Sequence, residues 1–357
     1  MGIKGLANLV ADEAPESIKS RGLEEYSGKT IAIDTSISVC QFLNAKGSRN
    51  LKNKDDEQTG HLRGLLYRVA TFMEAGIKPV YVFDGSPPAL KKKHAIAERN
   101  LRRQITAQAA KGAPPPKKPR VQLQQQTITQ PIRQETLIKE MPTNKIFDQC
   151  KKLFALLGIP IVQAPREAEA QCVRLCKDGK AYAEFDGAHV LEKLKLSRDE
   201  FIDLCILCGC DYCPNIEGME AKAALDMIRK HGCLEHVLKN AESYQIPNDW
   251  PYKNVRLLFT EPDVDKNVAE LQWEKPDEEG VIAFLVSHGF NKKHLTTAIG
   301  RINKALGLKS QKPLDDFYLA PKKEKKTVKL QTSLEKFYQS GSTSAVAPPK
   351  KEGCSSP

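Results

Sequence analysis

The stretch "KTIAIDTS" at residues 29–36 is a short apolar, β-branched run that ends in an acid, and "KPVYVFDG" at residues 78–85 has the same form. Between them, residues 61–76 place apolar side chains at helical spacing. A third run, "GIPIVQA", occupies residues 158–164. Strands that alternate with helices predict an α/β fold in which helices flank a parallel sheet.

The remaining chain divides by composition. Residues 1–105 and 141–235 form two parts of the predicted core, and residues 236–310 form its helical C-terminal part. Residues 106–140 are rich in Pro, Lys and Gln and cannot build a core, so we expect a mobile basic insertion. It is either a passive linker or an arm that closes on a polyanion. Residues 311–357 are low in complexity and predict a disordered tail.

The charge balance indicates a polyanionic partner. The 357 residues include 55 Lys and Arg against 44 Asp and Glu, a formal net charge of +11. That excess favours binding to a polyanion. No apolar run approaches membrane-spanning length, and the first residues lack a secretory pattern, so we expect a soluble intracellular protein without a membrane partner.

Four of the ten cysteines lie close together in "CILCGCDYC", at positions 205, 208, 210 and 213. Known zinc modules place a long loop between their cysteine pairs, whereas a single glycine separates the pairs here. We therefore interpret "FIDLCILCGC" as a buried helical turn in which cysteine replaces small apolar residues.

Acidic residues follow the apolar runs. Asp34 closes "TIAID", Asp84 closes "VYVFD", Glu167 and Glu169 come soon after "IPIVQA", and Asp211 follows "LCILCGC". Each acid alone is typical of a helix N-cap or a turn. In a parallel sheet, however, the carboxyl ends of the strands share one edge. Acids gathered there repel each other unless a cation lies between them.

A carboxylate cluster of this kind selects Mg²⁺ or Mn²⁺, because these cations prefer hard oxygen ligands. A basic protein with an acidic metal pocket suits the hydrolysis of phosphodiesters. The basic segment "SPPALKKKHAIAERNLRR" at residues 86–103 follows Asp84 directly. It is either a solvated surface face or a clamp on the scissile phosphate.

Several segments resemble the eukaryotic flap endonucleases, structure-specific nucleases of replication and repair: "MGIKGLANLVADEAP", "IAIDTSIS", "GIKPVYVFDGSPPALK", "LGIPIVQAPREAEAQC" and "FIDLCILCGCDYC". The resemblance covers nearly the whole chain apart from the Pro/Gln-rich insertion. It implies a PIN-like nuclease fold and a monomer that cleaves 5′ flaps of branched DNA with two Mg²⁺ ions. It also implies 5′-3′ exonuclease activity.

The resemblance also assigns roles to residues. The family's metal-binding acids match Asp34, Asp84, Glu167, Glu169 and Asp211. Its phosphate-contacting gateway lysine matches Lys91. Its gateway arginine matches Arg99 if this chain has one extra residue between the two positions. Its DNA contacts match Arg68, Glu167, Gly209 and Asp211, and residues 215–228 resemble the helix–two-turn–helix that grips duplex DNA.

The tail holds two copies of a sliding-clamp-binding pattern, Q-x-x-L-x-x-F-Y. One copy is "QTSLEKFY", with Gln331, Leu334, Phe337 and Tyr338. The other is "QKPLDDFY", with Gln311, Leu314, Phe317 and Tyr318. The resemblance implies docking on the replication sliding clamp (PCNA), and hence a nuclear protein, with nucleolus and mitochondrion as further family locations.

The sequence departs from the family after Ala183, where a strand, its loops and two metal-binding aspartates are missing. If "KAYAEFD" continues as a strand, Glu184 and Asp186 share one face and replace the lost pair. Alternatively, "EFDGAHVLEKL" is helical and one metal site is weakened or lost.

Three functions follow from these observations. The first is a Mg²⁺-dependent flap endonuclease, and the second is a catalytically impaired protein that binds DNA and the clamp. The third, a phosphatase, fits less well because Ser36 stands where a second aspartate is needed.

Two further departures from the family predict weaker DNA binding. Glu220 and Ala223 replace a glycine and a basic residue, and Cys40 replaces a stacking tyrosine.

Overall fold

The computed structural model describes residues 2–18, 21–45, 51–97, 142–182 and 187–307. The predicted insertion, the tail with both clamp-binding patterns, and the positions Arg99, Glu184 and Asp186 lie outside these residues.

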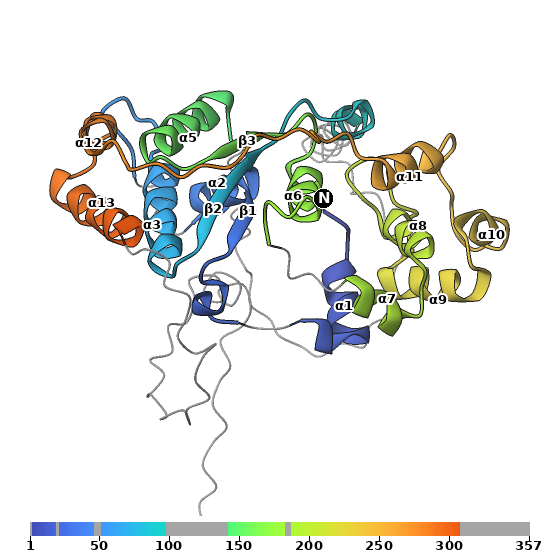
Figure 1. Cartoon of the computed structure of the whole chain (residues 1–357). Helices are drawn as coiled ribbons and strands as arrows, with labels where there is room; N and C mark the ends of the chain where they lie inside the picture. Colours follow the sequence, from blue (N-terminus) through green and yellow to red (C-terminus); the bar gives the residue numbers. More distant parts are fainter. Residues whose placement is uncertain (1, 19–20, 46–50, 98–141, 183–186, 308–357) are drawn as a thin grey trace, which may run out of the picture.

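Three parallel strands form the sheet in the described part of the chain, in the order β1 (Thr30–Asp34), β2 (Lys78–Phe83) and β3 (Ile161–Gln163). Asp34 is in register with Val82, so β1 and β2 end together at one edge. The central strand β2 is buried from Pro79 onward. The three predicted strands and their parallel arrangement are confirmed, and Figure 1 shows them between the flanking helices.

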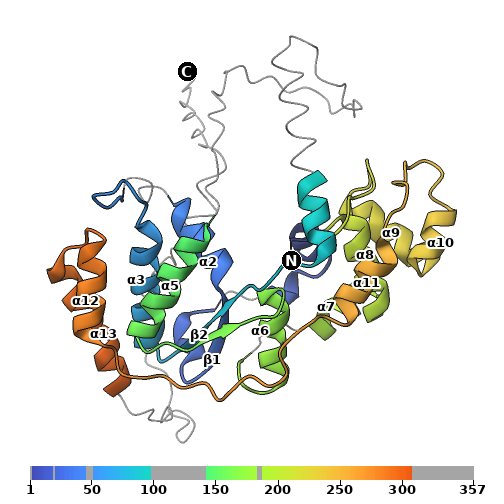
Figure 2. The same ribbon diagram turned by 90° about the horizontal axis from the view of Figure 1, so that it is seen from above.

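One face of the sheet carries the larger core. Tyr81 from β2 stacks on Phe154 with ring centroids 4.0 Å apart, and both side chains are fully buried. Leucines at helical spacing from the predicted helix fill the space around them. The helices on this side (Figure 2) are α2 (Thr35–Leu43), α3 (Gly60–Glu74), α5 (Asn144–Leu156), α12 (Glu278–Ser287) and α13 (Lys292–Gly307). The opposite face packs on α6 (Ala168–Lys177).

A second core joins a helix near the start of the chain to the helices of residues 187–260. Figure 2 shows these helices on the other side of α6 from α13. Buried cysteines of α8, among them Cys205 and Cys208, support the interpretation of this segment as a buried helix. The helices are α1 (Leu6–Glu13), α7 (Gly187–Leu194), α8 (Arg198–Cys208), α9 (Ala221–His231), α10 (Leu234–Lys239) and α11 (Tyr252–Thr260).

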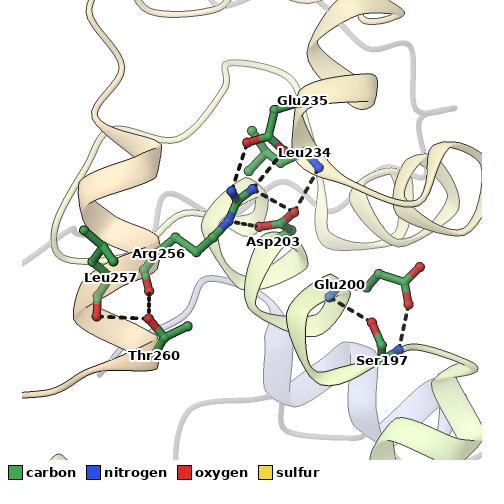
Figure 3. A network of polar contacts seen from close by, with 8 residues as sticks. All are labelled: Ser197, Glu200, Asp203, Leu234, Glu235, Arg256, Leu257 and Thr260. Carbon is green, nitrogen blue, oxygen red and sulfur yellow. Dashed lines mark hydrogen bonds and ion pairs between the residues drawn. The ribbon is translucent and has the colours of Figure 1, made fainter.

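A half-buried ion-pair network ties three of these helices together (Figure 3). The Arg256 guanidinium donates to Asp203 at 2.8 and 3.0 Å and to Glu235 at 2.9 and 3.0 Å. The Leu234 N–H donates to Asp203 at 2.9 Å. Asp203 is only 3% exposed, so its charge needs these donors. They fix α10 and α11 against α8.

In the part of the chain that the structure describes, strand β1 lies at an edge of the sheet, and all five of its residues are half-buried. The Tyr182 N–H donates to the Thr30 carbonyl at 2.7 Å, and within the described residues no strand continues this pairing. Helix α7 (Gly187–Leu194) makes "GAHVLEKL" helical, but the two alternatives for this region differ at residues 184–186, which lie outside the described residues. None of the described helices has the length and apolar character needed to cross a membrane.

Candidate metal centre

The ends of β1 and β2 position two aspartates side by side. Asp34 is the N-cap of α2, and its carboxylate accepts from the Ile37 N–H at 3.1 Å. Asp84 follows β2; it accepts from the Ser36 hydroxyl and, at 2.8 Å, from the Ala168 N–H. These bonds leave the carboxylates of two neighbouring strands directed to the same edge.

A close backbone approach at Gly85 brings the third strand's acids to the same place. The Gly85 N–H donates to the Arg166 carbonyl at 2.6 Å. A Cβ atom at Gly85 would lie 2.2 Å from the Pro165 carbonyl oxygen, so only glycine fits here. The loop after β2 therefore closes on the loop before α6. Sequence reasoning missed this role, although the glycine after Asp84 was its signal.

Three carboxylates form the centre of the site. Asp84, Glu167 and Glu169 each offer an oxygen atom within 4.8 Å of the others. Glu167 is the N-cap of α6 and is 6% exposed, and Glu169 lies in the first turn of that helix. An N-cap residue still has non-helical geometry, which lets two acids two positions apart approach one site.

Asp34 contributes a fourth carboxyl group. Its burial raises its pKa to about 6, and repulsion from Asp84 and Glu169 acts in the same direction. A raised carboxyl pKa means that the charged form lacks compensation. A divalent cation among these oxygens would supply that compensation, and an all-carboxylate donor set suits a hard cation. The residues present therefore fit such an ion.

Asp211 reaches the site from a turn after helix α8, not from the end of a strand. Lys91, in the helical residues 89–97, connects it to the cluster. Its ammonium nitrogen lies 2.5 Å from Glu167 Oε2 and 3.7 Å from Asp211 Oδ2. Burial lowers the pKa of Lys91, but Glu167, Asp211 and Glu169 together outweigh that effect and hold the pKa above its ordinary value. The structure thus brings Lys91 and the two acids together.

Two other predicted DNA contacts, Gly209 and Arg68, are held by bonds within the protein. Gly209 ends α8 with a φ of 96°, and its carbonyl accepts from the Lys4 N–H at 3.0 Å. Arg68 donates to Ser38 at 3.2 Å and to Gln41 at 3.1 Å, both on α2. The Arg68 side chain is therefore fixed by α2 and not by the acids.

The helix–two-turn–helix region has an acidic neighbour that sequence reasoning missed. Glu13 of α1 accepts from Lys222 and, at 3.1 Å, from Arg229, both on α9. Hydrogen bonds from Lys222 lead the causes that lower the pKa of Glu13. Two basic side chains of α9 are thus paired within the protein, and Glu220 stands exposed at the start of the same helix. Cys40 is half-buried in α2.

The fold and the acidic centre define a nuclease of PIN-like architecture, and comparisons with known proteins agree. The sequence matches the XPG N-terminal domain over residues 1–106 and the XPG I-region over residues 158–185. Flap endonuclease 1-A of Sorghum bicolor is 42% identical, with 92% of this chain and 94% of that protein covered. Flap endonuclease 1 of Zea mays is 39% identical, with 98% of each covered.

Solved structures support the fold. The catalytic core of Rad2 in complex with DNA substrate gives a TM-score of 0.62 at 21% identity, covering 84% of this chain and 100% of that one. Flap endonuclease-1 from Methanococcus jannaschii gives 0.59 at 24% identity, covering 81% and 96%. The chain belongs to the flap endonuclease family, whose members are structure-specific, metal-dependent nucleases. These relatives favour a nuclease over a catalytically impaired binding protein.

Proposed function

We propose that this chain is a Mg²⁺-dependent nuclease that cleaves 5′ flaps of branched DNA. The observation that carries the proposal is the approach of three carboxylates, Asp84, Glu167 and Glu169, to within 4.8 Å of one another. Asp34 and Asp211 extend this set. Mg²⁺ bound there would supply the charge that activates water and stabilises the developing charge on the phosphodiester.

The chain's own residues perform the remaining tasks. The contacts of Lys91 with Glu167 and Asp211 support a role for its ammonium group at a scissile phosphate next to the acids. Arg99 belongs to the same basic segment and is assigned to the same phosphate by family resemblance. Ser36 and the Ala168 N–H hold Asp84 in place, so the cluster is organised before substrate binds.

The preference for branched DNA rests on relatives and on charge. One structural neighbour, human GEN1, was solved in complex with Holliday junction DNA, and the Rad2 core with a DNA substrate. The net charge of +11 favours a nucleic acid. Contacts to the DNA backbone would select the shape of a junction and not a sequence.

A labelled 5′-flap duplex tests the proposal directly. The purified chain with Mg²⁺ should cut at the junction, whereas Asp84→Asn and a chelator should each abolish cutting. Replacing Mg²⁺ with Ca²⁺ separates binding from chemistry. Tight flap binding without cleavage in Mg²⁺ would contradict the proposal and favour the impaired binding protein.

We further propose that the tail binds the replication sliding clamp through Leu334, Phe337 and Tyr338, that the protein acts as a monomer, and that it works in the nucleus. A peptide of residues 325–345 should bind the purified clamp, and Phe337→Ala should abolish binding. A peptide that contains the second copy of the pattern, residues 311–318, should compete with it for the clamp.

Sedimentation of the full chain gives its mass in solution and so tests whether it is a monomer. Localisation of a tagged chain outside the nucleus would contradict the nuclear assignment.

A further inference from the structure

Two cysteines bracket the metal-ligand candidate Asp211. Cys210 and Cys213 face each other across a tight turn as an antiparallel bridge, with their sulfur atoms 3.8 Å apart. Opposed residues in such a bridge have Cα atoms at about 4.5 to 5.5 Å, within the range that a disulfide spans. We propose that Cys210 and Cys213 form a reversible disulfide that displaces Asp211 and weakens metal binding at the nuclease centre.

Hydrogen bonds fix both ends of the turn, so the residues at its centre must move when the two sulfur atoms come together. The Gly209 carbonyl accepts from the Lys4 N–H at 3.0 Å, and the Pro214 carbonyl accepts from Trp250 Nε1 at 2.7 Å. A disulfide brings the two sulfurs from 3.8 Å to about 2.05 Å. Asp211 and Tyr212 are the residues between them.

Of these two central residues, Asp211 is the one free to move. Tyr212 is 3% exposed and packs edge-on against Phe259 at 5.7 Å. The Asp211 side chain is 45% exposed, and its contact with Lys91 is a loose 3.7 Å. Formation of the disulfide therefore re-aims the Asp211 carboxylate relative to Glu167 and Lys91.

The oxidant class follows from burial. Cys210 is 2% exposed and Cys213 is 1% exposed, which excludes bulky disulfide reagents, so the oxidant we propose is the small molecule hydrogen peroxide. One thiolate attacks a peroxide oxygen and breaks the O–O bond, giving a sulfenic acid and hydroxide. The second thiolate attacks that sulfur, forming the S–S bond and releasing a second hydroxide. Two protons from the thiols convert both hydroxides to water, and two electrons pass from sulfur to peroxide. In a reducing compartment such a bond is transient.

The chain offers a precise chemical readout. A protease that cuts before aspartate separates residues 203–210 from residues 211–225, and so separates Cys210 from Cys213. After treatment of the full chain with hydrogen peroxide and alkylation, these fragments should stay linked until dithiothreitol is added. A bond between Cys205 and Cys208 would instead lie within one fragment. Absence of the linked species, or overoxidised sulfur in its place, would overturn the proposal.

The effect on the site is measured by Mn²⁺ titration of the oxidised chain, which should bind roughly ten-fold more weakly and recover with dithiothreitol. The variant Cys210→Ser should keep its Mn²⁺ affinity after peroxide treatment. If that variant does not fold, Cys213→Ala is used for the same measurement. Cys208→Ser, which retains the pair, should remain sensitive. Sensitivity that persists in Cys210→Ser, or linkage without loss of affinity, would overturn the proposal. The link to nuclease activity rests on the proposed function, but linkage and metal binding are read without it, so the two can fail separately.

Discussion

At the scale of single residues, Lys91 should compete with a bound cation for the acids, because its ammonium nitrogen lies 2.5 Å from Glu167. Lys91→Met should therefore bind Mn²⁺ several-fold more tightly. The same change should slow flap cleavage by roughly 100-fold, since a charge that stabilises the transition state is lost. Calorimetry and single-turnover cleavage measure the two effects. Lys93→Met, an exposed position on the same helix, should leave both unchanged. Weaker metal binding by Lys91→Met would contradict this role.

Gly85 sets the distance between Asp84 and the acids of α6. Gly85→Ala should lower the free energy of unfolding by roughly 1–3 kcal/mol, because the added methyl group meets backbone oxygens at 2.2 and 2.3 Å. It should also weaken Mn²⁺ binding. Urea unfolding and metal titration test this. Gly300→Ala is the matched control: nothing lies within 4 Å of its Cβ position, and helix propensity favours alanine. Equal behaviour of the two variants would show that the close approach is unimportant.

The acids of the site were predictable residue by residue, and their supports were not. An acid directly after an apolar run, as at Asp34 and Asp84, is a local pattern that a sequence displays. The pairing of Glu13 with α9 joins residues about 210 positions apart, and nothing local encodes it. Asp211 was predicted as a ligand and the segment before it as a helical turn, while its contact with Lys91 came only from the structure.

At the scale of elements, Arg256 holds α8, α10 and α11 together (Figure 3). Arg256→Met should lower the free energy of unfolding by about 3 kcal/mol, because Asp203 is left as a buried, unpaired charge. The variant should also bind a metal ion more weakly, since α8 leads into the turn that carries Asp211. Thermal unfolding measures the effect, with Lys253→Met on the same helix as control. If Arg256→Met were destabilised no more than Lys253→Met, the ion-pair network would not be important for stability.

His61 makes the stability of the α3–α5 contact depend on pH. Burial lowers its pKa from the ordinary 6.5 to about 4, and Nδ1 has no hydrogen-bond partner among the described residues. The unfolded chain then binds more protons, so stability falls as pH drops from about 6.5 towards 4, by up to about 3 kcal/mol. Urea unfolding across this range should show a smaller fall for His61→Gln. Parallel curves for the two proteins would contradict the assignment.

The elements themselves were largely predictable, because periodicity of apolar residues marks helices and strands directly. Residues 78–85 and 61–76 were assigned correctly for this reason. The packing of α1 beside α7 and α9 was not predicted, since it joins segments that lie far apart in the sequence. Position along the chain does not reveal such contacts.

At the scale of the whole molecule, the acids come from both cores: Asp34, Asp84, Glu167 and Glu169 from the sheet side, and Asp211 from the helical side. An ion shared between them binds only when both cores are folded and docked. Saturating Mg²⁺ at about 100 times its Kd should then add about 2.7 kcal/mol to stability.

The two tryptophans of the chain report on the two cores separately. Trp250 packs in the helical core, and Trp273 donates to the Pro79 carbonyl beside the sheet at 2.8 Å. In the variants Trp273→Phe and Trp250→Phe, fluorescence follows one core at a time during unfolding in urea. With chelator the two midpoints should differ, and Mg²⁺ should draw them together. A shift of one midpoint alone would show that the ion is held by one core.

Among the described residues, no strand pairs with the outer edge of β1, and such an edge carries a cost in solubility. An apolar edge strand is a template for pairing with another chain, and proteins guard such edges with charged residues. In this chain the charged residues are Lys29 and Asp34, which flank the apolar residues 30–33 of β1. Replacing Asp34 to make an inactive enzyme would therefore also remove a barrier to self-association. An inactive reference protein that stays in solution is better made at Asp84, which lies beyond the end of a central strand.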